Sequence, residues 1–395
     1  MDKYNKSQLY GGTAMNTVTY RYEQLERFCR DVFIHLGFSS EEAGQITDVL
    51  LLADLYGITS HGMHRLIRYR NSIRRGSVKI DAKPEVVFET PVSAVIDGHD
   101  GIGQLVGVFA TKMAIEKARR SGIAFVTVRN STHYGIAGYY TKMACDEGLI
   151  GISSTNTEAL MVHTHSRQPL LGTNPIAVAA PAEPYPFWFD AATTVVPRGK
   201  LEVYNKLDKP LKEDWAVDEN GSVCTDASHV LNCIINEVHL GGILPVGGST
   251  EEMGSHKGYG YAMIAEMMTA ITSGGLTSNH HRERRQGQGS GTCHAFIVID
   301  PAIFGDAQAM KGRLSALLEE LRSAQRADEN VPIYTHGEKE QICYAERMRN
   351  GIPLNISTVA EMKSIAEELG MDVTAYLGEV DVSQARLFSY EKKRE

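Results

Sequence analysis

Apolar residues recur every three to four positions between residues 25 and 36, which predicts a first helix. Ser39 and Glu42 then have the spacing of a capping box, and the apolar positions after them predict a second helix. A third helix is predicted over residues 60–75. Residues 1–18 show no periodicity, and we expect a loose extension there. The first part of the chain is therefore predicted to be helical.

The pattern changes after residue 80, where short apolar runs typical of strands alternate with longer helical patterns. Such alternation is typical of the α/β class. The polar, glycine-rich stretch 276–291 predicts a loop, and the C-terminal residues return to helical periodicity. The predicted strands cover residues 85–90, 93–98, 123–130, 149–156, 175–182, 186–192 and 294–300, and the predicted helices cover residues 103–122, 259–272 and 307–326.

Composition excludes a disordered chain and argues against a polyanion-binding protein. The 395 residues are 43% hydrophobic, which is ample for a sizeable core. Lys and Arg total 40 against 48 for Asp and Glu, a net charge of −8, so no basic excess indicates nucleic acid or anionic lipid as a partner. The first residues lack the apolar core of a secretion signal, and no apolar run is long enough to predict a membrane-spanning helix.

The six cysteines lie far apart and form no CxxC pair, so neither a thiol zinc cluster nor a redox dithiol is predicted. Free thiols in a reducing cytoplasm fit this distribution best. The neighbouring His280 and His281, like His163 and His165, have no carboxylate or thiol that would complete a ligand set. The sequence therefore predicts no metal site.

Three glycines follow a predicted strand and precede a predicted helix. Gly101, Gly103 and Gly107 resemble a dinucleotide fingerprint, in which glycine lets a diphosphate approach the start of the helix. The spacing GxGxxxG is a loose variant, and the next strand ends in Arg129 and Asn130 where an acidic ribose partner is expected. The alternative is that these glycines only let the chain turn tightly into the helix.

The segment SHGMHRLIRYR gathers several groups suited to an anionic substrate. On a helix that begins at Ser60, His61, Arg65 and Tyr69 fall on one face. Arg can hold a carboxylate through two parallel hydrogen bonds, and the helix start offers N–H donors that favour negative charge. The alternative is an ordinary solvated helix face.

His133 lies in a turn of small residues directly after the predicted strand 123–130. The carboxyl end of a strand is where α/β enzymes place reactive groups, and a neutral imidazole there can take a hydroxyl proton. A histidine in a loop is also common without any such role.

Four further turns combine small residues with hydroxyl groups: LGTNP, FDAATT, GSHKGYG and THGEKE. Such turns can hold a phosphate through backbone N–H groups, particularly where a helix follows. None matches a Walker loop, and each is equally compatible with an ordinary turn. They cover residues 171–175, 189–194, 254–260 and 335–340.

Taken in order, these segments resemble the malate/L-lactate dehydrogenase family, whose members are NAD(P)-dependent oxidoreductases unrelated to the Rossmann lactate and malate dehydrogenases. The resemblance extends over about residues 20–355. It is carried by SHGMHRLIRY, GIGQLVG, NSTHYGIAGYY, LLGTNPIAVAAP, FDAATT, GGILPVGG, GSHKGYGYAM, CHAFIVIDP, HGEKE and GIPLN.

The resemblance implies a fold that the periodicity alone does not determine. It is a three-layer α/β core with a mixed sheet that binds the cofactor in a non-Rossmann way, together with helices from both chain ends packed against each other, in a homodimer. The glycines of GIGQLVG then belong to the core. The expected segments are an extension over 1–18, a helical segment with the substrate-binding helix over 19–80, a cofactor-binding α/β core over 81–305 and a C-terminal helical segment over 306–395.

The same resemblance implies roles for individual residues. His133 is the base that takes the substrate hydroxyl proton, and His61 has this role in some relatives, so both are retained. Arg65 holds the carboxylate, while Ser60 and Tyr69 fix its orientation. The implied cofactor-binding residues are Asp190, Ala191, Ala192, Thr193, Thr194, His256, Lys257, Gly337, Glu338 and Lys339.

The expected reaction interconverts a 2-hydroxy acid and its 2-keto acid, with malate first and lactate next. Malate needs a second cation, for which Arg68 and Lys142 are candidates. The alternatives within the family are sulfolactate, ureidoglycolate, a diketo sugar acid and a cyclic imino acid. NAD is favoured, with NADP open. The alternative from a different class is a catalytically silent, nucleotide-binding dimer.

Overall fold

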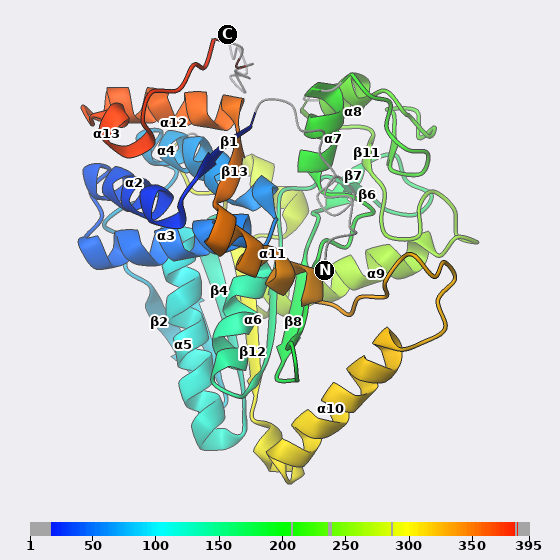
Figure 1. The fold of residues 1–395 in the computed structure, drawn as a ribbon. Helices are drawn as coiled ribbons and strands as arrows, with labels where there is room; N and C mark the ends of the chain where they lie inside the picture. Colours follow the sequence, from blue (N-terminus) through cyan, green and yellow to red (C-terminus); the bar gives the residue numbers. More distant parts are fainter. Residues whose placement is uncertain (1–16, 207, 236–238, 286, 384, 386–395) are drawn as a thin grey trace. The chain divides into compact units, whose positions relative to one another are not determined.

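The computed structural model describes residues 17–206, 208–235, 239–285, 287–383 and 385 of the chain (Figure 1). The extension predicted over 1–18 lies outside the described residues except for Thr17 and Val18, which are part of a strand. The described chain divides into two compact units. The first contains the residues up to Arg74 and those from Lys339 onward, and the second is Arg75–Glu338.

The first unit joins the two ends of the chain. Strand β1 pairs antiparallel with β13, α12 packs on α4, and α13 packs on α2. The predicted capping box is confirmed, because Ser39 Oγ accepts from the Glu42 N–H at 3.2 Å while the Glu42 carboxylate accepts from the Ser39 N–H at 3.0 Å. The elements are β1 Thr17–Tyr20, α2 Tyr22–His35, α3 Ser40–Leu55, α4 Leu66–Arg74, β13 Ile352–Asn355, α12 Ile356–Glu368 and α13 Val373–Leu377. Helix α11 spans Glu338–Asn350. The expected packing of N- and C-terminal helices is confirmed.

The helix predicted over residues 60–75 is wrong in its first half. Residues Thr59–His61 and Met63–Arg65 form two short 3-10 turns, and only α4 is α-helical. Gly62 separates the turns with φ −90° and ψ −141°, which is not helical, and the Met63 N–H donates to the Asp54 carboxylate at 2.7 Å. Ser60, His61, Arg65 and Tyr69 therefore do not lie on one continuous helix face.

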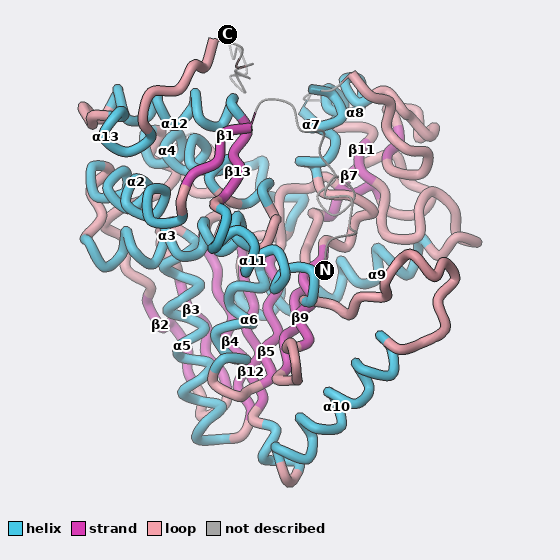
Figure 2. Tube along the Cα trace, viewed as in Figure 1, coloured by secondary structure: helices cyan, strands magenta, loops and turns pink. Residues whose placement is uncertain are grey.

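The second unit is built on a seven-stranded sheet with the order β2-β3-β4-β12-β5-β8-β9 (Figure 2). All neighbouring strands are antiparallel except β3 and β4, which are parallel, so the sheet is mixed as the resemblance implied. Its strands are β2 Glu85–Glu89, β3 Ser93–Asp97, β4 Ile123–Ser131, β5 Ile150–Thr155, β8 Ile176–Ala180, β9 Phe187–Ala191 and β12 Thr292–Ile299. Each lies within or next to a strand predicted from the sequence.

Helices cover both faces of this sheet. On one face, α5 (Gly103–Ser121) and α6 (Ala137–Asp146) bury alanines against the strands, and small side chains let the helices approach closely. On the other face, α9 (Ser255–Glu266) continues into a π-helical segment, Met267–Ile271, which contacts β4, β5 and β12. Figure 1 shows α5 and α6 in front of the sheet. These are the three layers of the expected core.

A smaller sheet completes the second unit. Its order is β10-β11-β6-β7, and its strands are two or three residues long, too short to leave a period-two pattern in the sequence. Helices α7 (Arg198–Lys206) and α8 (Ala227–Ile235) pack on each other. The predicted loop 276–291 contains a 3-10 segment, Ser278–Glu283, and α10 spans Ala307–Arg322. The short strands are β6 Met161–Val162, β7 Pro169–Leu171, β10 Ala216–Val217 and β11 Gly242–Ile243.

The glycines of GIGQLVG allow helix α5 to pack closely against its neighbours. A Cβ on Gly103 would overlap the carbonyl oxygens of Thr132 and His133, and a Cβ on Gly107 would lie 2.6 Å from the Tyr140 ring. Helix α5 can approach the turn after β4 only because these two positions carry no side chain. The dinucleotide fingerprint is therefore a false match, and tight packing explains it.

Candidate active site

The turn that carries His133 is held from several sides. It follows the carboxyl end of β4 and leads into α6. Thr132 Oγ1 accepts from the Gly103 N–H and donates to the Gly101 carbonyl, both at 3.0 Å. The start of α5 and the His133 turn are thus joined by hydrogen bonds.

A buried aromatic stack supports the same turn. The Tyr134 ring lies parallel to the His294 ring with centroids 4.2 Å apart, and it stacks on Tyr140 at 4.6 Å. The two ring nitrogens of His294 bond to the hydroxyls of Ser131 and Thr155, each at 2.8 Å. Burial lowers the pKa of His294 to about 3, so this imidazole stays neutral and structural at physiological pH.

Asp190 connects the His133 turn to β9. Its Oδ2 accepts from the Gly138 N–H at 2.7 Å, in the first turn of α6. A carboxylate at this position is stabilised by the N-terminal end of the helix dipole. Asp190, predicted to bind the cofactor, therefore contacts the helix that begins directly after the His133 turn.

The residues that follow Asp190 lie close to the start of α9. Ala191 ends β9 and Ala192 follows it, both partly buried. The Thr193 N–H and hydroxyl donate to the Thr173 carbonyl at 2.9 and 3.0 Å, and the Thr193 carbonyl accepts from the Val246 N–H at 2.9 Å. A Cβ on Gly258 would overlap the Val246 backbone, so the first turn of α9 lies directly against this segment. The hydroxyl of the buried Thr194 has no hydrogen-bond partner among the described residues.

The start of α9 is a candidate anion site. Gly254 precedes the helix with φ +89°, and no side chain caps the N-terminal N–H groups. His256 and Lys257, both predicted to bind the cofactor, are exposed in this first turn. The Ser255 and Lys257 N–H groups donate to the Thr250 and Gly254 carbonyls at 3.1 and 2.9 Å, so the helix dipole and the Lys257 ammonium are the features that favour phosphate oxygens here.

A third predicted segment also lies along β9. The Trp188 N–H donates to the His336 carbonyl at 3.1 Å, and Gly337, with φ +95°, would place a Cβ 2.8 Å from Trp188. Glu338 turns its carboxylate back to the Thr335 N–H at 3.2 Å. Lys339 is exposed and belongs to the first unit. The second unit thus brings the predicted segments 190–194, 256–257 and 337–338 together along β9 and the residues that directly follow it.

The first unit holds the SHG turn. Ser60 Oγ lies 2.9 Å from His61 Nδ1, and Arg65 Nε donates to the Ser60 carbonyl at 2.6 Å. The two Nη groups of Arg65 are the part of its guanidinium that could hold a carboxylate. Tyr69 is buried in α4. The predicted substrate residues therefore come from two 3-10 turns and one helix.

His61 is neutral at physiological pH. Burial, together with the positive charges of Arg65 and Arg68 and the ring of His64, lowers the pKa of His61 to about 3. A pKa this far below neutral pH makes the imidazole a weak base, which argues against His61 as the proton acceptor.

The chain matches the malate/L-lactate dehydrogenase family over residues 20–363. It belongs to this family. It is 41% identical to the malate dehydrogenase of Pyrococcus horikoshii over 357 residues, which covers 90% of this chain and 97% of that protein. It is 35% identical to the L-sulfolactate dehydrogenase of Methanocaldococcus jannaschii, covering 90% of this chain and 98% of that protein. The solved malate dehydrogenase of Entamoeba histolytica superposes with a TM-score of 0.87 at 34% identity, covering 90% and 99%.

Membership of this dehydrogenase family makes the chain an oxidoreductase, and dehydrogenases of the family use a nicotinamide cofactor. The resemblance inferred from the motifs is confirmed. Among the described residues, no helix combines the length and the apolar composition needed to cross a bilayer.

The described residues fit a nicotinamide dinucleotide. The start of α9 has no side-chain cap, and the exposed His256 and Lys257 in its first turn supply a positive charge and side-chain donors suited to a diphosphate. Gly254 leaves this start open, because a Cβ there would meet only the Lys257 side chain, at 3.6 Å. The dehydrogenase can therefore hold the cofactor without a Rossmann fingerprint.

The two candidate proton-transfer histidines differ in the tautomer that their hydrogen bonds favour. His133 Nδ1 accepts from the Gly135 N–H at 3.3 Å, which places the proton of the neutral ring on Nε2. The Ser60 hydroxyl can accept from His61 Nδ1, which leaves a lone pair on Nε2. Acting as a base through Nε2 would require His133 to give up the long Gly135 contact.

Sequence reasoning missed Asp54, which is 1% exposed and lies beneath the SHG turn. Its carboxylate accepts from Met63, and its carbonyl accepts from Arg347. A Cβ on Gly62 would overlap this carboxylate. The available signal was an acidic residue within the apolar run VLLLADL.

Proposed function

We propose that this dehydrogenase interconverts a 2-hydroxy acid and its 2-keto acid, with malate as the first substrate and lactate as the next. The malate dehydrogenases among its relatives support this order, and the L-sulfolactate dehydrogenase at 35% identity supports sulfolactate as an alternative. Ureidoglycolate, a diketo sugar acid and a cyclic imino acid are the further alternatives within the family.

One observation carries the proposal. Three separate segments proposed to bind the cofactor meet around β9, and Asp190 of this strand contacts the start of α6, directly after the His133 turn. A proton-transfer group beside the cofactor is what the oxidation of an alcohol needs, because the hydroxyl proton and the hydride leave adjacent atoms.

The cofactor residues would act in three ways. The start of α9 with His256 and Lys257 would bind the diphosphate, Asp190–Thr194 would line the strand end, and Gly337 and Glu338 would lie beside Trp188, with Lys339 as a further cofactor-binding residue. The nicotinamide, when bound, accepts hydride from the hydroxy acid or returns it to the keto acid. NAD is proposed first and NADP second.

His133 is the first candidate for the hydroxyl proton because it lies in the same unit as β9 and next to α6. His61 is the alternative because the family resemblance gives this role to the histidine of the SHG segment in some relatives. Deprotonation by a positioned base typically contributes about 10²- to 10⁴-fold to such a rate.

Arg65 would bind the substrate carboxylate through its Nη groups, with Ser60 and Tyr69 fixing the turn around it. Malate carries a second carboxylate. Its candidate partners are Arg68 of α4 and Lys142, whose ammonium pairs with Asp146 at 2.5 Å.

We also propose a homodimer formed through α9 and its π-helical continuation. Tyr261, Ile264, Met267 and Ile271 follow one another along these helices and are 54%, 44%, 51% and 62% exposed. A second copy would bury this apolar stripe. The six free thiols suit a reducing compartment such as the cytoplasm.

The substrate is tested by measuring oxidation of NADH or NADPH with the purified protein and a panel of keto acids led by oxaloacetate and pyruvate. Turnover of oxaloacetate above all other acids supports the proposal. Preference for sulfopyruvate, or for an imino or ureido acid, replaces malate by that substrate. Binding of NADH without turnover of any acid would favour the silent, nucleotide-binding alternative.

A further inference from the structure

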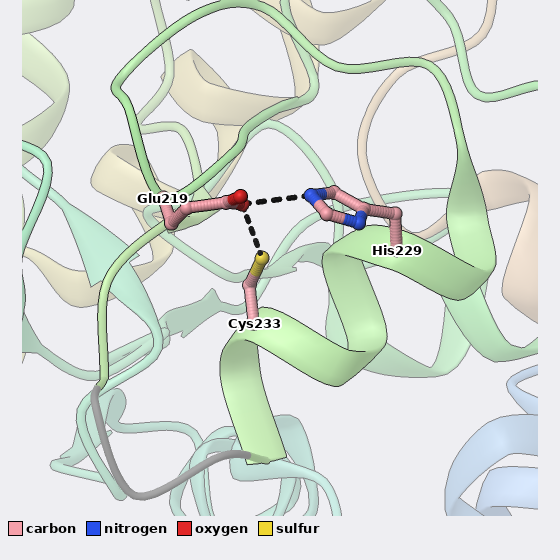
Figure 3. Close-up of side chains that lie close together, drawn as sticks. All are labelled: Glu219, His229 and Cys233. Carbon is pink, nitrogen blue, oxygen red and sulfur yellow. Dashed lines mark hydrogen bonds and ion pairs between the residues drawn. The ribbon is translucent and has the colours of Figure 1, made fainter.

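Three side chains with metal-binding chemistry, none of them among the residues proposed to bind the cofactor, meet in the second unit. Glu219, His229 and Cys233 place one ligand atom each within 4.8 Å of one another. His229 Nε2 lies 2.7 Å from a Glu219 carboxylate oxygen, and Cys233 Sγ lies 3.3 Å from the same oxygen (Figure 3).

Two of these side chains share one helix face. His229 and Cys233 are four residues apart on α8, the spacing that brings side chains of successive turns together. The Asp226 carboxylate accepts from the His229 N–H at 3.0 Å and so holds the start of this helix. Figure 3 shows both side chains pointing from α8 toward Glu219.

Glu219 is presented by a tight turn. The Asp218 carboxylate accepts from the N–H groups of Asn220 and Ser222 at 2.9 and 3.0 Å, and the Gly221 N–H donates to the Asp218 carbonyl at 3.0 Å. The backbone on each side of Glu219 is therefore held while its carboxylate faces α8.

The ligand types and distances suit zinc. Zinc bonds of about 2.0–2.3 Å in a tetrahedron separate neighbouring ligand atoms by about 3.3–3.6 Å. The separations of 2.7 Å between Glu219 and His229 and of 3.3 Å between Glu219 and Cys233 need only a small opening to reach these values, and the ligand atoms of His229 and Cys233 lie within 4.8 Å of each other. Thiolate, imidazole and carboxylate ligands favour zinc over calcium or magnesium, which prefer oxygen alone.

An ion pair between Glu219 and His229 explains two members of the cluster but not the third. Cys233 is only 7% exposed, yet its sulfur is directed at the carboxylate rather than into the apolar cluster that buries its neighbours Val230 and Ile234. A buried thiol commonly packs as a small apolar group. A cation bound between these side chains would explain why the sulfur faces the carboxylate.

We propose that Glu219, His229 and Cys233 bind one zinc ion, with water as the fourth ligand. Binding releases the Cys233 thiol proton, so the dication meets one thiolate, one carboxylate and a neutral imidazole. The ion would tie the 218–221 turn to α8 and stabilise this part of the second unit. This role does not depend on the proposed dehydrogenase reaction.

The test uses the full chain, stripped of metal with EDTA under reducing conditions and titrated with Co²⁺. We expect one Co²⁺ per chain with a thiolate charge-transfer band in the near ultraviolet, and displacement of Co²⁺ by Zn²⁺. The band should disappear in Cys233→Ser, and Co²⁺ affinity should fall more than tenfold in His229→Asn, whose exposed side chain can change without loss of the fold.

Two control variants match these changes. Cys145→Ser removes a half-buried thiol outside the cluster, and His280→Asn removes an exposed histidine that pairs with Glu283 at 2.6 Å. Both should keep the band and its stoichiometry. Absence of a charge-transfer band in the parent, or an unchanged band in Cys233→Ser, would overturn the site.

Discussion

Asp54 determines the backbone of the SHG turn. Its carboxylate takes the Met63 N–H out of helical hydrogen bonding and occupies the space that a side chain at position 62 would need. His61 and Arg65 therefore sit in 3-10 turns on either side of Gly62. At the scale of one residue, a buried acid shapes the segment proposed to bind substrate.

Gly62→Ala tests this packing. Because the added methyl overlaps the Asp54 carboxylate, we expect the free energy of unfolding to fall by about 1–3 kcal/mol and the KM for the keto acid to rise. Gly44→Ala is the matched control, since no atom lies within 4 Å of a Cβ there and a helix interior favours alanine. Equal stabilities of the two variants in urea unfolding would contradict the contact.

Asp54 also predicts a pH dependence of stability. Burial raises its pKa from 3.8 to about 7, so between these values the folded protein holds a proton that the unfolded chain has released. Its contribution to stability is complete below about pH 4 and is lost as pH rises through about 7.

Asp54→Asn replaces the titrating carboxyl group by an amide that does not ionise. The stability of the parent relative to the variant should therefore fall by about 1.4 kcal/mol per pH unit between about pH 4 and about pH 7. Urea unfolding of both proteins across this range measures the difference. Parallel stability curves would show that folding does not raise the pKa of Asp54.

At the scale of elements, prediction from the sequence succeeded where a pattern was long. The strands of the seven-stranded sheet and helices α2, α3 and α5 each span enough residues to show a period. No such period is visible in the two-residue strands β6, β10 and β11 or in the short strand β13. The 3-10 turns at residues 59–65 were missed because their conformation depends on Asp54, which lies in another helix.

The site was partly predictable for the same reason. His133 and the turns around β9 were found from small residues at strand ends, whereas the supports beneath them were not. His294 lies within a strand that reads as ordinary core, and only the structure shows it bonded to Ser131 and stacked on Tyr134. Contacts between distant segments leave no local spacing in the sequence.

The start of α9 gives a prediction about cofactor binding. Lys257→Ala removes a cation from a helix start that has no side-chain cap, and a hydrogen bond to a charged group contributes about 1.5–3 kcal/mol. We expect NADH affinity to fall at least tenfold while the unfolding temperature without cofactor stays constant. Lys112→Ala, an exposed lysine on α5, should leave affinity unchanged. Equal NADH affinity of the two variants in calorimetry would exclude this role for Lys257.

At the scale of the whole molecule, the chain ends form one unit and the middle of the chain forms another. The mixed sheet was expected only through the family resemblance, and the order of its strands was not predicted, because many sheet orders are compatible with the same local patterns. The apolar stripe along α9 is the described feature most directly relevant to assembly.

Ile264→Glu tests the proposed homodimer. Ile264 lies in the centre of the stripe, so a charge there should convert the dimer to a monomer at micromolar concentration, as measured by light scattering after gel filtration. Val87→Glu is the matched control, because Val87 is similarly exposed at 42% but lies on strand β2. A parent protein that is already monomeric would refute the dimer.

The most direct test of the proposed chemistry is the rate of NADH oxidation with oxaloacetate for the parent, His133→Asn and His61→Asn, with NADH binding measured in parallel. We expect turnover by the parent and a loss of about 10²-fold or more in kcat in the variant that lacks the proton-transfer histidine, with NADH affinity kept within a few-fold. Near-parental kcat in both variants would contradict proton transfer by either histidine.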